Sequence, residues 1–297
     1  MFNVDKTRSV RKRALFALFI GAAAIAFSPI FVRLSELGPS ATAFYRVFFA
    51  LPALWIWMLF NHSIDGKYRQ PSSAGDYIRL TLAGLFFACD LAVWHWSVTL
   101  TTVANSTLLA NAAPIFVTFG AFFLFGERFS KVFFVGLVCT LIGVIVLMSN
   151  SLGVGQRNLL GDFLGVTTAI FYAAYILTVG RLRSEFSTTT IMIWSGFVSC
   201  LVLVPVTMLS GESFVAKSLV GWSILLCLAL FSQAGGQSLI AYSLAHLPTA
   251  LGSVGLLIQP VLAALIAWII FAEALGGLQL IGGIVVLVGI YLAQRGS

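Results

Sequence analysis

The chain has 297 residues, of which 60% are hydrophobic and only 9% are charged, and its formal net charge is +7. A mean hydropathy of +1.02 over that length excludes a soluble domain, because a soluble fold needs a largely polar surface. The composition indicates an integral membrane protein. The positive charge needs no nucleic acid to explain it, since basic loops face the anionic inner leaflet of a membrane.

Ten stretches of the chain are long and apolar enough to cross a bilayer, whose core of about 30 Å takes roughly 20 apolar residues per helix. These runs are continuously apolar, whereas the strands of a membrane β-barrel alternate. We therefore predict an all-α integral membrane protein with ten transmembrane helices. The predicted spans are Ala14–Leu34, Ser40–Phe60, Tyr77–Leu100, Val103–Phe125, Val132–Met148, Leu159–Val179, Thr188–Leu209, Leu219–Leu244, Thr249–Phe271 and Leu278–Leu292.

The basic residues are distributed unequally between the loops. With the N-terminus placed in the cytoplasm, thirteen of the seventeen Lys and Arg fall on the cytoplasmic side and three on the outer side, namely Arg33, Arg157 and Lys217. Cytoplasmic loops carry the excess of basic residues, so we expect a multi-pass protein of the bacterial inner (plasma) membrane with both termini in the cytoplasm.

The basic, then apolar N-terminus with Ala24-Ile25-Ala26 also fits a cleaved secretory signal. Cleavage would leave nine spans and destroy the symmetry of the two halves. We therefore expect the first helix to be retained.

Two stretches of the chain repeat each other at a spacing of 146 residues. Each half contains five spans, an odd number, so the second half must enter the membrane from the opposite side. We predict one transmembrane transporter domain, residues 1–297, built from inverted repeats at about 14–150 and 159–296. The repeated residues are Pro114 and Pro260, Phe125 and Phe271, Glu127 and Glu273, Gly136 and Gly282, Leu141 and Leu287, and Gly143 and Gly289.

The sequence lacks the usual signatures of soluble catalysis. The longest loop, Asn61–Asp76, has sixteen residues, and we find no phosphate-binding glycine loop, metal-ligand spacing or nucleophile elbow. The cysteines all fall within predicted spans without paired spacing. We expect no catalytic residue, no metal and no cofactor. The four cysteines are Cys89, Cys139, Cys200 and Cys227.

Two charged residues lie deep within predicted spans, Arg46 in the second and Asp90 in the third. Charges at that depth are costly and must face a partner or a water-filled cavity. One interpretation is a buried ion pair that fixes helix register; others are gating, substrate binding, or a proton relay through Asp90 alone. The sequence leaves these interpretations open.

Three of the prolines within spans lie close to polar residues, namely Pro29, Pro114 and Pro260. A proline has no N–H, so Pro260 cannot donate to the carbonyl of Leu256 and opens the helix there. Gln259 precedes Pro260, and Asn111 comes three residues before Pro114. Interruptions at equivalent places in two halves indicate the central site of a transporter, although helix packing is the better explanation of any single polar residue.

Aromatic residues away from the helix ends are further candidates for a cavity lining. Tyr172 and Tyr175 share one helix face, and such rings favour flat apolar or aromatic solutes; packing against lipid explains each ring taken singly. The expected substrate-binding residues are Ser28, Tyr45, Asp90, Trp94, Asn111, Tyr172, Tyr175, Gln233, Gln237 and Gln259, and the expected structural or gating residues are Arg46, Pro29, Pro114, Pro260, Glu127 and Glu273.

One block of residues resembles a known family. The proline of the fourth span, then Phe125-Gly126-Glu127 and a span with Gly136 and Gly143, is mirrored by Pro260, Phe271-Ala272-Glu273, Gly282 and Gly289. This pattern is similar to the EamA group of the drug/metabolite transporter superfamily, over about residues 14 to 292. The resemblance implies a ten-helix carrier with two inverted repeats and cytoplasmic termini that exports small metabolites.

Within the group, the chain looks most like the YddG-type exporters of aromatic amino acids. Ala272 departs from Gly126, which puts strict equivalence of the two turns in doubt.

We therefore expect an exporter of small metabolites, amino acids including aromatic ones, that works by alternating access around a cavity formed by spans 1, 3, 4, 6, 8 and 9. Its partners would be a small-molecule substrate and membrane lipid, with no nucleic acid and an undetermined oligomeric state. One alternative is an exporter of other solutes or drugs with proton coupling through Asp90. Another is a membrane-embedded lipid-modifying enzyme using Asp90 and His95, which lie about 140° apart on a helix, a poor arrangement for acting on one substrate.

Overall fold

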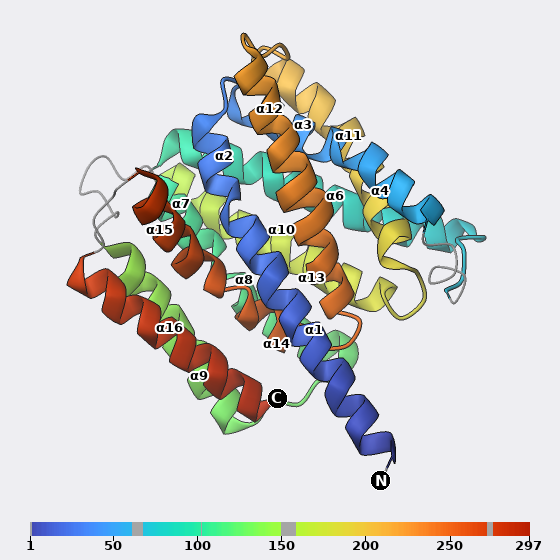
Figure 1. Cartoon of the computed structure of the whole chain (residues 1–297), viewed down its shortest axis with the longest axis vertical. Helices are drawn as coiled ribbons and strands as arrows, with labels where there is room; N and C mark the ends of the chain where they lie inside the picture. Colours follow the sequence, from blue (N-terminus) through green and yellow to red (C-terminus); the bar gives the residue numbers. More distant parts are fainter. Residues whose placement is uncertain (1, 61–67, 102, 150–158, 272–275) are drawn as a thin grey trace. The chain divides into compact units, whose positions relative to one another are not determined.

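The computed structural model describes residues 2–60, 68–101, 103–149, 159–271 and 276–297, and these residues are helical apart from short turns and connections (Figure 1). Ten stretches of helix in this part of the chain are long and apolar enough to cross a membrane, and each overlaps one predicted span. The predicted fold class, an all-α membrane protein with ten spans, is confirmed.

Several of the spans consist of two or three consecutive helical segments. In chain order the segments are α1 (Phe2–Ala26), α2 (Ser28–Leu34), α3 (Pro39–Phe48), α4 (Ala50–Phe60), α6 (Ala74–Leu100), α7 (Val103–Ala110), α8 (Ala113–Phe125), α9 (Lys131–Met148), α10 (Leu159–Leu182), α11 (Thr188–Leu209), α12 (Leu219–Cys227), the π-helix η2 (Leu228–Gln237), α13 (Ser238–Ser243), α14 (Thr249–Gly255), α15 (Ile258–Phe271) and α16 (Gly277–Gly296).

Serine side chains start three of these helices. The hydroxyl of Ser130 accepts from the Phe133 N–H before α9, Ser187 from Thr190 before α11, and Ser218 from the Gly221 N–H before α12. A serine in this position satisfies one of the backbone donors that the first turn leaves open. The sequence thus fixes where these helices begin.

The chain folds as two compact units, and each unit contains segments from both halves of the sequence. The first unit comprises Met1–Ala92 and Thr178–Leu247, and the second comprises Val93–Leu177 and Pro248–Ser297. Helices α6 and α10 therefore begin in one unit and end in the other.

In the first unit, α1 packs against η2 and α13, while α11 packs against α3 and α4. Small residues allow the close contacts. A Cβ added at Gly21 would lie 2.7 Å from the carbonyl oxygen of Gly236, and one added at Gly84 would lie 2.7 Å from the carbonyl oxygen of Ser195. Side chains larger than hydrogen would force these backbones apart.

In the second unit, the tightest helix pair is α9 with α16, the last spans of the two repeats. A Cβ at Gly136 would lie 2.3 Å from the Ala293 nitrogen, and one at Gly143 would lie 2.6 Å from the Val286 nitrogen. The earlier glycine of α9 faces the later residue of α16, and the later glycine faces the earlier residue. The two helices therefore run antiparallel. Antiparallel packing of equivalent spans is what an inverted repeat requires.

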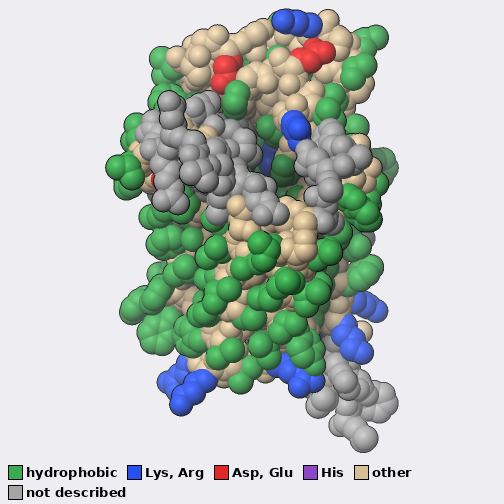
Figure 2. Space-filling view, turned by 90° about the vertical axis from the view of Figure 1, so that its left-hand side faces the viewer, with side chains coloured by type: hydrophobic (Ala, Val, Ile, Leu, Met, Phe, Trp, Pro, Cys, Tyr) green, Lys and Arg blue, Asp and Glu red, His purple; other side chains and the backbone are tan. Residues whose placement is uncertain are grey.

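The outer faces of these helices carry large apolar side chains. Phe134 and Val138 on α9 and Ile281 and Ile284 on α16 are each about half exposed. Figure 2 shows hydrophobic side chains over much of the face drawn. An apolar surface of this extent suits lipid and not water.

Replacement of Gly143 by alanine is expected to lower the thermal unfolding midpoint of the purified protein, because the added methyl group meets backbone atoms of α16 and overpacking of this kind costs about 1–3 kcal/mol. Gly283→Ala is the matched control, since the nearest atom to its Cβ is Val261 Cγ1 at 3.5 Å. Equal unfolding midpoints for the two variants would show that the α9–α16 contact is not tight.

Candidate functional site

A pocket in the second unit lies where two spans are interrupted. The space open to the centre of a water-sized molecule is about 30 Å³, which is room for ordered water. Its lining comes from the α7–α8 and α14–α15 interruptions and from α10. The lining residues are Ala110, Asn111, Ala113, Pro114, Tyr172, Ile176, Ser253, Leu256, Leu257 and Gln259.

The two interruptions fall at equivalent places in the repeats. Helix α7 ends at Ala110 and α8 begins at Ala113; α14 ends at Gly255 and α15 begins at Ile258. Each break comes just before one of the matched prolines, Pro114 or Pro260, as the sequence predicts. Two broken helices therefore meet in one pocket.

Both breaks contain turns with three-residue hydrogen bonds. The carbonyl of Leu256, which Pro260 cannot reach as a donor, accepts from the Gln259 N–H at 2.9 Å. At the first break, the Ala112 carbonyl accepts from the Ile115 N–H at 3.0 Å. The span is therefore interrupted before Pro260, and a turn with three-residue hydrogen bonds satisfies the Leu256 carbonyl.

The first turns of two helices border the pocket. Ala113 and Pro114 belong to the start of α8, whose preceding residue, Ala112, makes no side-chain cap, and Gln259 belongs to the start of α15. Helix starts carry a partial positive charge and unsatisfied N–H donors. Two such partial charges therefore border the pocket.

One amide donor at the pocket is unsatisfied. Within the described part of the chain, Nε2 of Gln259 is buried without a hydrogen-bond partner. A buried donor of this kind destabilises the folded protein unless a bound molecule supplies an acceptor. Ser253 donates to the Ala250 carbonyl at 2.8 Å, so its hydroxyl proton is engaged. Asn111 is half-buried in the lining.

Of the aromatic candidates, Tyr172 lines the pocket and Tyr175 does not. The two rings stack with centroids 6.3 Å apart and an interplanar angle of 24°. Tyr175 is 2% exposed and packs against the ring of Tyr172. Trp94 is half-buried at the end of α6 and lies outside this lining.

A second set of the expected residues gathers in the first unit. Arg46 Nε donates to Gln233 Oε1 at 3.0 Å, and the guanidinium interacts electrostatically with Asp90, which is 9% exposed. Gln233 and the buried Gln237 belong to the π-helix η2. Insertions of this kind in an α-helix are frequent at functional sites.

The remaining candidates of the first unit take part in packing. Tyr45 donates its hydroxyl proton to the Phe214 carbonyl at 2.7 Å, and its ring contacts Trp222 at 5.2 Å. Ser28 begins α2, with Pro29 in the first turn, and its buried Oγ has no partner among the described residues. The first span is therefore interrupted at Phe27, as its proline predicts.

Glu127 contacts the start of another helix. Its carboxylate accepts from the Thr249 N–H at 2.8 Å and from the Ala250 N–H at 3.4 Å. This is the geometry of a helix cap supplied by a residue remote in sequence. Glu273 and the side chain of His95 lie outside the described residues.

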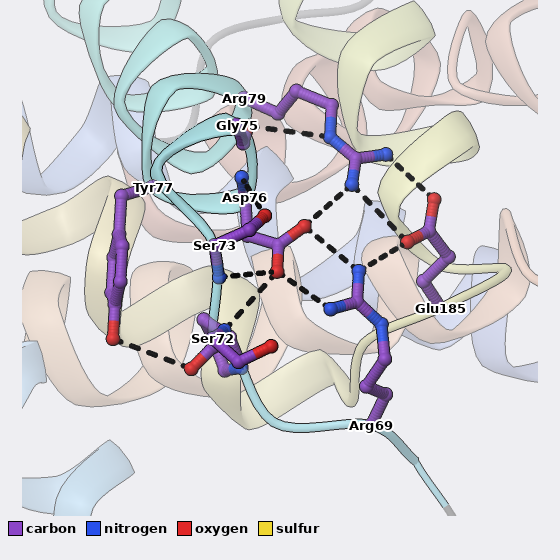
Figure 3. A network of polar contacts seen from close by, with 9 residues as sticks. Arg69, Ser72, Ser73, Gly75, Asp76, Tyr77, Arg79 and Glu185 are labelled. Carbon is purple, nitrogen blue, oxygen red and sulfur yellow. Dashed lines mark hydrogen bonds and ion pairs between the residues drawn. The ribbon is translucent and has the colours of Figure 1, made fainter.

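One charged cluster was missed by the sequence reasoning (Figure 3). The Asp76 carboxylate lies 2.6 Å from Arg69 and 2.7 Å from Arg79. The Glu185 carboxylate lies 2.6 Å from each of the same two guanidinium groups. The cluster ties the start of α6 to the turn between α10 and α11, both in the first unit. Only the excess of basic residues near these loops hints at it, because Arg79 and Glu185 are 106 residues apart.

The ion pairs of the cluster shift the pKa values of Glu185 and Arg69. Hydrogen bonds from Arg79 and then Arg69 lower the pKa of Glu185 to about 2, and the two carboxylates raise the pKa of Arg69. Arg69 also lies over the ring of Phe186, 4.8 Å from its centroid. The carboxylate of Glu185 is therefore charged over the whole physiological range.

Ten spans within the described residues, two of them with matched proline breaks at one pocket, are typical of a multi-pass membrane transport protein. Comparison with protein families identifies the group: residues 12–149 and 159–294 each match the model of the EamA-like transporter family. The chain belongs to this family. Its two matches coincide with the two repeats seen in the sequence.

Individual relatives agree with this assignment. The chain is 23% identical over 276 residues to the pseudopaline exporter CntI of Pseudomonas aeruginosa, covering 92% of this chain and 93% of that protein. It is 30% identical over 177 residues to the threonine/homoserine exporter RhtA of Salmonella typhimurium, covering 59% and 57%. One solved structure superposes with a TM-score of 0.76 at 16% identity over 98% of this chain and 97% of that chain, which shows the fold alone.

The charged cluster is expected to stabilise the first unit in a pH-dependent way. The pKa of Glu185 in the folded protein, about 2, lies below its ordinary value of 4.5. The Glu185 carboxylate therefore contributes its full stabilisation above pH 4.5, and this contribution is lost as the pH falls towards 2. The unfolding midpoint of Glu185→Gln should therefore fall below that of the parent protein at neutral pH, and the difference should shrink under acid. A difference that is unchanged across this range would rule out ion pairing as its cause.

Proposed function

We propose that the protein exports small amphipathic metabolites, amino acids including aromatic ones, across the bacterial inner membrane by alternating access, with both termini in the cytoplasm. The observation that carries this proposal is the pocket at the two broken helices, with its unsatisfied amide on Gln259. The names of the relatives CntI and RhtA, both exporters of small molecules, support the direction and the class of solute.

An amino acid has groups that fit each part of the lining. Its carboxylate would lie against the starts of α8 and α15 and accept from Gln259 Nε2. Its ammonium would approach the carbonyl of Ala110, which has lost its helical donor because Pro114 has no N–H. Its side chain would lie against Tyr172 and Ile176.

The pocket is smaller than an amino acid, so binding requires its walls to separate. The interrupted helices are suited to this, because a break allows the two parts of a span to move independently. We place the two inverted repeats in one transport domain. Since every lining residue belongs to the second unit, we take the parts of the interrupted spans as the bodies that move to open the pocket.

The polar cluster of Arg46, Asp90 and Gln233 is the basis of a second version of the proposal, in which transport of other solutes or drugs is coupled to protons through Asp90. The observation that favours it is a carboxylate, 9% exposed, within a span. The opposing observation is the nearby guanidinium of Arg46, which suits a pair that fixes helix register. In this version Ser28, Tyr45 and Gln237 would contribute to a site in the first unit.

Coupling is decided by measuring uptake into liposomes with and without a pH gradient. We expect uptake of amino acids without any gradient, and Asp90→Asn should keep that uptake if the protein folds. Stimulation by an imposed pH gradient that disappears in Asp90→Asn would instead establish proton coupling.

Replacement of Gln259 by alanine should raise the KM for amino acid uptake by roughly tenfold, because it removes a donor to a charged acceptor. Gln259→Glu should raise the KM further, since its carboxylate repels that of the substrate. Gln294→Ala, near the end of α16 and outside the pocket lining, is the control. Unchanged KM in both Gln259 variants, with protein correctly inserted, would place the site elsewhere.

Truncation of Tyr172 tests the aromatic wall separately. Tyr172→Ala should reduce uptake of phenylalanine more than uptake of threonine, because stacking of two rings contributes about 0.5–1.5 kcal/mol beyond area burial, whereas Tyr172→Phe keeps the ring and should preserve the ratio of the two rates. An equal loss for both solutes in Tyr172→Ala would indicate a structural role only.

A further inference from the structure

We propose that Glu127 is a positioning residue that holds one wall of the pocket in place by capping α14. The inference rests on the proposed role of the pocket in solute binding, and it concerns a residue that makes no contact with the pocket itself. Glu127 lies beyond the end of α8, whereas the lining residues of that helix, Ala113 and Pro114, are at its start.

The cap replaces one that α14 does not provide for itself. The residue before the helix is Pro248, which makes no side-chain hydrogen bond to the first turn. The amide donors of Thr249 and Ala250 are satisfied instead by the two carboxylate oxygens of Glu127. The start of α14 is therefore held by the connection between α8 and α9.

A glycine directs Glu127 towards α14. Gly126 ends α8 with φ of +67°, a left-handed conformation that glycine adopts without strain. The N–H groups of Gly126 and Glu127 both turn back to the Ala121 carbonyl. This sharp end to α8 aims the next side chain at the neighbouring helix and not along the axis of α8.

Helix α14 transmits the position of its start to the pocket. It has only seven residues, all buried, and it packs against α8. Ser253 of this helix lines the pocket, and so do Leu256 and Leu257, the two residues that follow the end of the helix. The cap lies at one end of this short helix and the break at the other. Helix α8 thus contributes one part of the lining at its start, and the residue beyond its end caps the helix that carries another part.

The experiment compares Glu127→Ala and Glu127→Gln with Glu36→Ala. Glu36 accepts from the Lys217 N–H at 2.7 Å and the Ser218 N–H at 3.0 Å, just before α12 in the first unit, so its loss removes a carboxylate contact with a helix start outside the pocket. Two readouts are taken on the full chain in detergent and in liposomes: amide hydrogen exchange over residues 249–257, and the KM and maximal rate of phenylalanine uptake.

We expect Glu127→Ala to speed exchange through Leu257 and to raise the KM by roughly fivefold, with a smaller change in the maximal rate. Glu127→Gln keeps one acceptor oxygen for Thr249, so its exchange rates and its KM should lie close to those of the parent protein. Glu36→Ala should speed exchange near Ser218 alone and leave the KM unchanged.

Unchanged exchange beyond Ala250 in Glu127→Ala, or an unchanged KM with a midpoint lowered as in Glu36→Ala, would overturn the inference. The exchange readout needs no solute. If the parent protein fails to take up phenylalanine, the proposed function fails, while exchange still decides whether Glu127 positions the wall.

Discussion

The constraint on which the rest of the structure depends is that the backbone of a membrane protein must satisfy its own hydrogen bonds, because the bilayer core offers no water. A proline within a span removes one donor and forces a local solution. Near both matched prolines of the second unit the chain forms a tight turn, in which the carbonyls of Leu256 and Ala112 accept from residues three positions later. The turn ends one helix and starts another. The starts of two helices thereby come to face a pocket in the middle of the spans.

The same constraint explains the placing of the acidic residues at helix starts. Glu127 satisfies the first amides of α14, Glu36 those before α12, and Glu212 the Ala41 N–H on α3 at 2.8 Å. In each case the acid and the helix that it caps come from different halves of the chain. The repeats are therefore joined through carboxylate caps at the ends of spans, and through glycine contacts such as α9 with α16 within them. These are directional and close-packed interactions, which replace the hydrophobic effect as the source of association in lipid.

Much of this architecture is predictable from residues alone. Continuous apolar runs give the ten spans, and Pro114 and Pro260 give the interruptions, whereas the pairing of α9 with α16 is seen only in the structure. The contacts between charged residues are less accessible. Arg46 suggests a partner at Asp90, and the hydrogen bond to Gln233 was not expected, because no local pattern joins residues 187 positions apart. The cluster of Arg69, Asp76, Arg79 and Glu185 is hidden for the same reason. Tyr45 and Tyr172 look alike in the sequence, and only packing distinguishes the ring that contacts Trp222 from the ring in the pocket.

The central claim is that the pocket recognises the carboxylate of an amino acid, and the most direct measurement is counterflow of labelled phenylalanine in liposomes that contain the purified protein. Threonine and phenylethylamine serve as competitors, since the first keeps the carboxylate without the ring and the second keeps the ring without the carboxylate. The account predicts counterflow that threonine inhibits and phenylethylamine does not. Equal inhibition by the amine, or no counterflow by folded protein, would contradict it.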